Sequence, residues 1–204
     1  MSRENPDRHL FLLGSANPGK LREYRDILHG LDLELVAPTD LHPVPPKPPE
    51  DASTFAENAT SKARAYALAS GLPTIADDSG LEVHALRGAP GVRSRRFFGE
   101  DASAEERNAK LLAMLDRVED RSARFVCVTA LASPDGHVEL FEGDVRGEIA
   151  AAPRGEGGFG YDPVFVIAGD GRTMAELSSE EKHRVSHRGI AGAKLRARLA
   201  AGAP

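Results

Sequence analysis

The chain has 204 residues, of which 41% are hydrophobic and 28% charged, and its formal net charge is −5 at pH 7. This composition is typical of a folded globular protein and excludes a disordered chain. The negative charge gives no general attraction to nucleic acid or to anionic membranes. The length is typical of one domain, so we expect residues 1–8 to be a polar extension and residues 9–204 to form a single domain.

Cysteine usage and hydropathy bear on where the protein resides. Cys127 is the only cysteine, which excludes an internal disulfide and a cysteine-ligated zinc site and favours a reducing compartment. The sequence holds no stretch of the roughly 18–20 apolar residues that a membrane-spanning helix needs, and its polar start predicts no secretory signal. We therefore expect a cytoplasmic protein with no membrane partner and no nucleic-acid partner.

The first third of the chain predicts alternating strands and helices. Residues 9–13 are an apolar run typical of a buried strand, residues 19–30 repeat apolar side chains at helical spacing, and residues 33–36 favour a second strand. The five prolines between positions 42 and 49 predict an extended connector. Thr54 and Glu57 form a capping box that begins a helix reaching about residue 70, and Gly71 is expected to end it.

The remaining two thirds add further strands and helices. Residues 73–76 predict a short buried strand, and residues 104–115 predict a helix. Two long strands, at 124–132 and 137–149, are joined by a turn that contains Pro-Asp-Gly. After a glycine-rich loop, residues 164–167 predict a strand and residues 185–200 a closing helix. This order of elements predicts a mixed α/β fold built as one unit.

The segment between the first strand and the first helix is a candidate anion site. It reads Ser15-Ala16-Asn17-Pro18-Gly19-Lys20. Backbone amides at a helix N-terminus and a lysine suit a phosphate group. The spacing is not that of a P-loop, so an ordinary helix N-cap is the alternative interpretation.

Two acidic pairs are candidate metal ligands, one at residues 50–51 and one formed by Asp77 and Asp78. The second pair follows a buried strand, at the edge where ligands collect in open α/β sheets. Carboxylates suit Mg²⁺, which takes one or two of them and completes its shell with phosphate and water. Neighbouring side chains of a strand point to opposite faces, so at most one aspartate need face a metal. The alternative is that one of them caps a turn with Ser79.

The loop from Gly155 to Asp162 combines four glycines with Phe159 and Tyr161. Glycines let a flat ring approach closely, and an aromatic face can stack on a nucleotide base. We therefore favour a ligand-binding loop over a flexible connection. Asp162 is expected either to accept a hydrogen bond from a ring N–H or to hold the loop.

A third group of polar residues lies where the closing helix is expected to begin. Lys182, His187 and Arg188 are hydrogen-bond donors that suit a carbonyl-rich heterocycle or a phosphate. The alternative is a solvated charged surface.

Taken together and in this order, the motifs resemble those of the RdgB/Ham-type inosine triphosphate pyrophosphatases, over roughly residues 9–200. Several motifs at matching separations are far more specific than any one of them. The segments that carry the resemblance are Ser15 to Lys20, Thr54-Phe55-Ala56-Glu57-Asn58-Ala59, Ala76-Asp77-Asp78-Ser79-Gly80-Leu81, Gly157-Gly158-Phe159-Gly160-Tyr161-Asp162-Pro163 and Ser186-His187-Arg188-Gly189.

The resemblance implies an elongated α/β fold with a central mixed sheet, flanking helices, and two lobes with a cleft between them, in a homodimer. It implies Mg²⁺-dependent hydrolysis of noncanonical purine triphosphates (ITP, dITP and XTP) to the monophosphate and pyrophosphate, which cleanses the nucleotide pool. The chain departs from the family pattern at three positions. Ser15 and Ala16 stand where the family often has Thr and Gly, and Ala52 replaces a frequent glycine.

The resemblance also implies roles for individual residues. Asp78 is expected to be the proton acceptor and a metal ligand, Glu50 a second metal ligand, and Ser79 a substrate contact. The triphosphate is expected to bind at one segment, and the nucleotide and its base at the others. These substrate-binding residues are Ser15, Ala16, Asn17, Pro18, Gly19 and Lys20 for the triphosphate, and Phe159, Gly160, Tyr161, Asp162, Lys182, His187 and Arg188 for the nucleotide.

Two rival interpretations remain open at this point. A Maf-type pyrophosphatase has a related fold but prefers other nucleotides, and the base-contacting loop argues against it. A nucleotide sensor without turnover would bind through the same glycine loop and lysine, and the retention of both Asp77 and Asp78 disfavours it.

Overall fold

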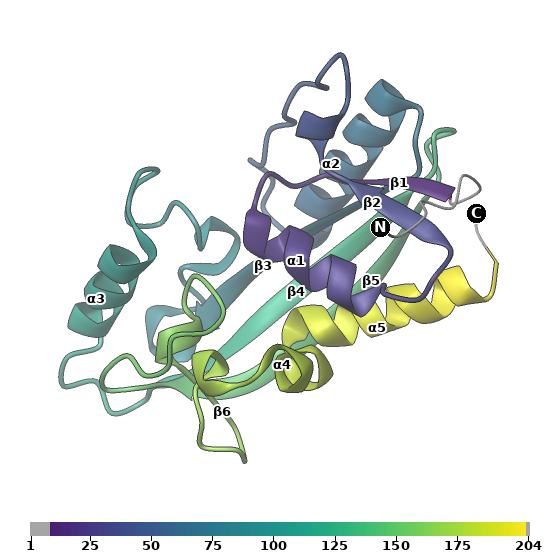
Figure 1. Cartoon of the computed structure of the whole chain (residues 1–204). Helices are drawn as coiled ribbons and strands as arrows, with labels where there is room; N and C mark the ends of the chain where they lie inside the picture. Colours follow the sequence, from purple (N-terminus) through teal and green to yellow (C-terminus); the bar gives the residue numbers. More distant parts are fainter. Residues whose placement is uncertain (1–8, 203–204) are drawn as a thin grey trace. The chain divides into compact units, whose positions relative to one another are not determined.

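The computed structural model describes residues 9–202, so the predicted extension at residues 1–8 lies outside the described part. Six strands form one sheet in the order β2-β1-β3-β4-β5-β6, and five α-helices accompany it within the described residues (Figure 1). The strands are β1 His9–Leu13, β2 Leu33–Val36, β3 Thr74–Val83, β4 Ser122–Ala132, β5 Val138–Ile149 and β6 Phe165–Ile167. The helices are α1 Pro18–Ile27, α2 Phe55–Ser70, α3 Ala104–Met114, α4 Ser179–Val185 and α5 His187–Ala200.

The sheet is mixed, as the resemblance implies. β1 pairs in parallel with β2 and with β3, whereas β5 and β6 pair antiparallel. A tight turn joins β4 to β5, in which Ser133 N donates to the His137 carbonyl at 3.0 Å. The predicted α/β class is therefore confirmed. Within residues 9–202, no helix has the length and apolar content needed to cross a lipid bilayer.

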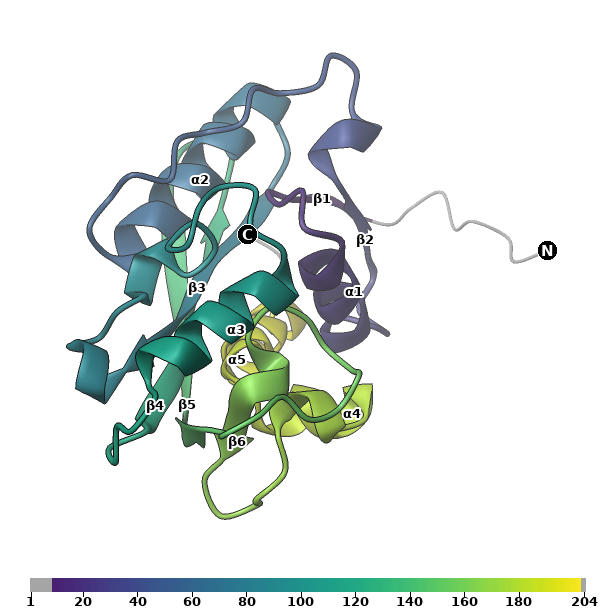
Figure 2. The ribbon, with the colours of Figure 1, turned by 90° about the vertical axis from the view of Figure 1, so that its left-hand side faces the viewer.

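The chain packs as two compact units, each with its own hydrophobic core. The described residues 9–77, 129–141 and 192–202 belong to the first unit, and 78–128 and 142–191 to the second. In the first unit, Tyr24 of α1 and Leu28, which follows the helix, pack with Phe11 of β1 and Leu35 of β2. Figure 2 shows α1 beside β1 and β2. In the second unit, Leu111 of α3 belongs to the core that also contains Phe125, Tyr161 and Phe165.

Local capping signals fix where the helices begin and end. The Thr54 hydroxyl accepts from Glu57 N, and the Glu57 carboxylate accepts from Thr54 N, so the predicted capping box of α2 is present. Gly71 ends α2 in the left-handed conformation, with φ of 69°. α1 ends at Ile27, before the predicted residue 30, because Gly30 belongs to the turn that follows the helix and has φ of 85°.

β3 is longer than the strand predicted at residues 73–76. It continues through Asp77, Asp78 and Ser79 to Val83, so the alternative that an aspartate caps a turn here is wrong. Aspartate is disfavoured in strands by intrinsic propensity. The ion pair between the buried Asp77 and Lys20 of α1 overrides that preference.

The closing helix predicted over residues 185–200 is α5, which begins at His187, two residues later than predicted, because Ser186 adopts an extended conformation between α4 and α5. Ser186 ends α4, and its hydroxyl accepts from Gly189 N at 3.0 Å in the first turn of α5. A Cβ at Gly189 would collide with the carbonyl of His183, so the junction requires a glycine. The prediction missed α4, although Ser178 and Glu181 form the capping box that begins it.

Candidate active site

The first cluster of charged side chains surrounds Asp77, inside the first unit. The Asp77 side chain is fully buried, and its Oδ2 lies 3.0 Å from Nζ of Lys20, the third residue of α1. Lys62 of α2 donates from Nζ to the Asp77 main-chain carbonyl at 3.1 Å. Nζ of Lys62 also lies 3.0 Å from Oε1 of Glu50, which comes from the proline-rich connector. Two ammonium groups and two carboxylates thus gather here from four segments of the chain.

Glu50 is held in its ionised form by this cluster. Burial alone raises the pKa of its carboxyl, but the ion pair with Lys62 and the nearby charges of Lys20 and Lys47 outweigh burial and leave the pKa below its ordinary value. Glu50 is therefore a carboxylate at neutral pH. Such an oxygen donor can bind either an ammonium group or a hard metal cation.

The segment from Ser15 to Lys20 begins α1, and its alternative interpretation as an N-cap is confirmed. Asn17 Oδ1 accepts from Gly19 N at 2.9 Å, and Ser15 Oγ accepts from Asn17 N at 3.2 Å. The first turn of α1 contains no acidic side chain. The protein therefore supplies no negative charge at the positive N-terminal end of this helix. An anion can bind there even though Asn17 caps the helix. Ala16 and Pro18 complete the segment without a charged group.

The second cluster lies within the second unit and is centred on Asp162. Asp162 Oδ2 lies 2.6 Å from Nζ of Lys182 and accepts from Phe159 N at 2.7 Å. The Lys182 ammonium also lies 4.8 Å from the centroid of the Phe159 ring. Of the two roles expected for Asp162, the structure gives it that of holding the loop, because it ties both ends of the Phe159–Asp162 turn and one cation together.

Arg188 and His187 extend this cluster from the first turn of α5. Arg188 is only 1% exposed, its Nη2 donates to Ser79 Oγ at 2.8 Å, and its Cζ lies 5.4 Å from the Phe159 ring centroid. The His187 ring stacks on Phe125, with centroids 4.6 Å apart and an interplanar angle of 13°. Since both side chains are buried, the alternative of a solvated charged surface is wrong.

Strand β3 takes part in both clusters through residues that are close together in the sequence. Asp77 belongs to the first cluster, and Ser79 binds Arg188 in the second. Asp78 lies between them in the chain and is 6% exposed. One strand therefore carries a lysine partner, a second buried carboxylate and an arginine partner in a row.

The carboxylates present fit a magnesium ion that shares its shell with a phosphate ligand. Within residues 9–202, His, Cys, Asp and Glu side chains form no group of three or more that could hold a metal by themselves. Mg²⁺ needs only one or two protein carboxylates when phosphate oxygens and water complete its octahedron. Glu50 in the first unit and Asp78 in the second each offer carboxylate oxygens of that kind, so either side chain suits a metal that arrives with its substrate.

Lys62 and Phe125 are members of these clusters that the sequence analysis missed. For Lys62 a signal was present, because it falls on the buried face of α2 together with Ala59, Ala63 and Tyr66. A lysine within an apolar stripe needs a buried partner. Phe125 gave no such signal, since an aromatic residue in a strand is ordinary core.

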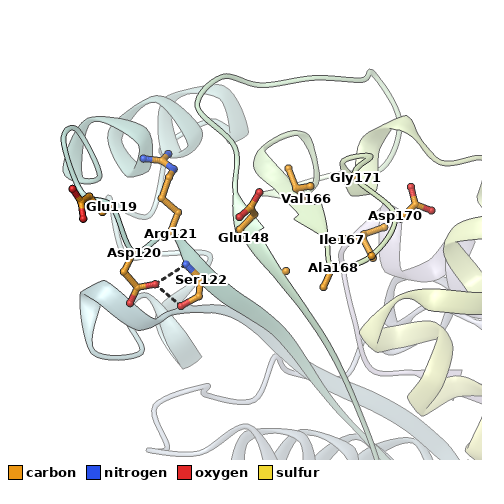
Figure 3. A pocket seen from close by; sticks show the side chains of 12 residues that line it. Glu119, Asp120, Arg121, Ser122, Glu148, Val166, Ile167, Ala168, Asp170 and Gly171 are labelled. Atoms are coloured by element: carbon orange, nitrogen blue, oxygen red, sulfur yellow. Dashed lines mark hydrogen bonds between the residues drawn. The ribbon is translucent and has the colours of Figure 1, made fainter.

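A pocket of about 730 Å³ in the second unit contains none of these residues (Figure 3). Its lining carries four carboxylates, Glu119, Asp120, Glu148 and Asp170. The Arg121 guanidinium in this pocket is already bonded to the Leu115, Ile149 and Ala150 carbonyls, at 2.8, 2.6 and 2.7 Å. The pocket therefore does not suit a negatively charged ligand.

Comparisons with known proteins agree with this fold. A HAM1 protein from Coxiella burnetii superposes with a TM-score of 0.86 at 42% identity, covering 95% of this chain and 100% of the other. The Ham1 protein of Staphylococcus aureus gives 0.83 at 43% identity, over 94% and 98%. The fold is therefore that of the Ham1 proteins.

Sequence relatives agree with the structural ones. A dITP/XTP pyrophosphatase of Thermus thermophilus is 52% identical over 192 residues, which is 93% of this chain and 90% of the relative. One from Geobacter sulfurreducens is 50% identical over 190 residues, 92% and 95% respectively. The model of the Ham1 family matches residues 11–198. The chain belongs to the Ham1 family.

Proposed function

We propose that this chain hydrolyses noncanonical purine nucleoside triphosphates, among them ITP, dITP and XTP, to the monophosphate and pyrophosphate in a Mg²⁺-dependent reaction. Its relatives place it among the nucleoside-triphosphate pyrophosphatases, because those at about 50% identity are named dITP/XTP pyrophosphatases. The observation that carries the proposal is the pair of lysines that contact Asp77. One of them belongs to the first turn of α1, which contains no acidic side chain.

The first cluster binds the triphosphate. Lys20 and Lys62 have carboxylate partners, and because an ammonium group has three donors each lysine can keep its partner and also bind a phosphate oxygen. The amide groups at the start of α1 add donors for phosphate oxygens. Because every nucleoside triphosphate carries the same phosphates, this cluster contributes affinity and does not select the base.

The second cluster binds the nucleotide and its base. The Phe159 ring offers a stacking face, and His187 and Arg188 donate to the 6-oxo group of hypoxanthine or xanthine. The Arg188 guanidinium has five N–H donors in a fixed fork, so it can bind Ser79 and a substrate oxygen together. Adenine presents an amino group at the same place, so donors of the protein would face donors of the base. Each buried donor left without an acceptor costs about 1–3 kcal/mol of binding free energy.

Hydrolysis requires a proton acceptor close to the attacking water, and Asp78 takes that role. It accepts a proton from the water, while Lys20 and Lys62 hold the departing pyrophosphate. Glu50 and Asp78 would hold the magnesium ion, which when bound neutralises part of the triphosphate charge. The two lysines thus act on the leaving group, Asp78 acts on the water, and Glu50 and Asp78 would bind the metal.

The test is to measure pyrophosphate release from a panel of nucleoside triphosphates, with and without Mg²⁺. We expect dITP and XTP to exceed dATP and dGTP by at least about tenfold in kcat/KM. Release of single phosphates, or equal rates on all nucleotides, would contradict the proposal. Preference for a pyrimidine or a methylated nucleotide would favour the Maf-type alternative, and binding of dITP without turnover would favour a sensor. The expected homodimer and cytoplasmic location stay predictions.

A further inference from the structure

One buried side chain outside both clusters reaches the main chain of the loop that carries Phe159. Asn108 lies in α3 and is 4% exposed, and its Nδ2 donates to the carbonyl of Gly160 at 3.1 Å. The two residues are 52 positions apart in the sequence. The bond is therefore a tertiary contact that the fold must build, and it ends on the loop residue next to Phe159.

Within residues 9–202 the amide of Asn108 makes its hydrogen bond through the donor alone. Asn108 Oδ1 is buried and has no hydrogen-bond partner within residues 9–202. Burying a half-satisfied amide is unfavourable, whereas an apolar side chain of similar volume would be buried at no such cost. The neighbour one turn further along α3, Leu111, is apolar and belongs to the core. What Asn108 gains over a leucine is the bond to Gly160.

The loop needs external bonds to hold one conformation. Gly158 and Gly160 have φ of 69° and 67°, which only glycine adopts readily, and glycine loses more conformational entropy on ordering than any other residue. Asp162 fixes the loop from within by accepting from Phe159 N. From outside, Asn108 holds the Gly160 main chain, and the Tyr161 hydroxyl donates to the Ser94 carbonyl at 3.0 Å.

The direction of the Gly160 carbonyl decides how the residues on either side are placed. A trans peptide is planar, so fixing the carbonyl also fixes the N–H of Tyr161, which points the opposite way. Without Asn108 this peptide plane could rotate, since Gly160 has no side chain to restrain it. Rotation there would shift the Phe159 ring and the carboxylate of Asp162 relative to Lys182.

We propose that Asn108 is a positioning residue for base recognition: it holds the peptide of Gly160 so that the Phe159–Asp162 loop is ordered before the nucleotide binds. This inference rests on the proposed function, because it assigns the loop to the base. It adds that α3 contributes to this pre-ordering, through the hydrogen bond from Asn108 to Gly160. The loop contacts the base equally before and during the reaction, so Asn108 acts on KM and leaves kcat nearly unchanged.

The kinetic test uses two substitutions that remove the donor. Asn108→Leu replaces the amide with an apolar side chain of similar size, and Asn108→Ala removes the side chain beyond Cβ. In both, KM for dITP is expected to rise about tenfold, and kcat to change by less than about twofold. Inorganic tripolyphosphate has phosphates and no base, so its inhibition constant is expected to stay at the wild-type value.

The control for general damage to α3 is Leu111→Val, which trims a core side chain on the same face of the helix and leaves the bond from Asn108 to Gly160 in place. The control is stringent because Leu111 belongs to the same core as Tyr161 of the loop. It is expected to lower the melting temperature while leaving KM for dITP unchanged. If Leu111→Val raises KM as much as Asn108→Leu does, the effect belongs to helix packing and the proposal is wrong.

A second readout does not depend on activity. Hydrogen exchange in the ligand-free protein is expected to speed up in the loop around Gly160 in Asn108→Leu, and not in Leu111→Val. Wild-type KM together with wild-type exchange in both Asn108 variants would overturn the proposal. If the wild-type protein fails to hydrolyse dITP, the proposed function fails, and the exchange experiment still decides whether Asn108 orders the loop.

Discussion

The two clusters both bury cations, but they hold them in different ways. In the first, Lys20 and Lys62 converge on Asp77 and are neutralised by carboxylates. In the second, Lys182 pairs with one carboxylate, and both Lys182 and Arg188 lie over the face of an aromatic ring. An ammonium group has three donors, so a lysine held by a carboxylate can still bind a phosphate oxygen. A cation packed against an aromatic face is fixed in space and suits the recognition of shape and hydrogen-bonding pattern.

This difference predicts that substitutions will separate by kinetic parameter. Changes in the first cluster should affect all triphosphates alike, and changes in the second should affect the choice of base. The residue between the clusters along β3, Asp78, should affect turnover itself.

The largest effect is expected at Asp78. Asp78→Asn keeps the shape of the side chain but loses the proton acceptor and the charge for the metal, so kcat is expected to fall by a factor of about 10³ or more. Circular dichroism should show an intact fold. Asp77→Asn is the matched comparison and should lose less activity, because Asp77 acts through Lys20. Wild-type-like pyrophosphate release from the Asp78 variant at saturating Mg²⁺ would refute the assignment.

A smaller effect is expected at Lys20. Lys20→Ala removes a charged donor worth about 1.5–3 kcal/mol, so KM is expected to rise about 10- to 100-fold, with a smaller change in kcat. The rise should be the same for dITP, dATP and dGTP. If the preference among purines changes while triphosphate affinity stays constant, Lys20 belongs to the base site.

The aromatic face of the second cluster should matter next. Phe159→Leu retains an apolar side chain but loses the stacking surface, which contributes about 1–3 kcal/mol per base, so KM for dITP is expected to rise about tenfold. The inhibition constant of tripolyphosphate should not change. Equal weakening of tripolyphosphate would show that the variant has disturbed the phosphate site as well.

The smallest effect concerns stability and pH. Burial raises the pKa of Tyr161 to about 12, against about 10 for an unfolded tyrosine. The neutral phenol is therefore favoured in the folded state, and this stabilisation is complete below pH 10 and lost as pH rises from 10 to 12. Tyr161→Phe should lose about 1 kcal/mol at pH 8 through its bond to Ser94, measured by urea unfolding. The wild-type advantage should shrink by pH 11.5, and an unchanged advantage would contradict this reasoning.

Local signals in the sequence predicted most of the fold. The capping box at Thr54, the left-handed Gly71 and the apolar run of β1 each depend on neighbouring residues, and each is present as expected. The extension of β3 through Asp77 was not predictable in this way, because a lysine from α1 stabilises it. The seven-residue helix α4 was not predicted. Ser186 separates it from α5, since this residue ends α4 while its hydroxyl accepts from Gly189 N in the first turn of α5.

The candidate site likewise contains residues that local motifs indicate and residues that only distant contacts explain. Motifs pointed to Lys20, Asp78 and Arg188 as candidates because their residue types carry the chemistry. Lys62 and Asn108 were not identified, because their partners lie far away in the sequence, at Asp77 and Gly160. Only the folded chain brings such pairs together.

The central claim, that one cluster binds phosphates and the other selects the base, is tested most directly by one comparison. The ratio of kcat/KM for dITP to that for dATP is measured in Lys20→Ala and in Arg188→Ala. The account predicts an unchanged ratio in Lys20→Ala, with both values lowered, and a ratio reduced about tenfold in Arg188→Ala, mainly through loss of dITP activity. An unchanged ratio in Arg188→Ala, or a reduced one in Lys20→Ala, would contradict it.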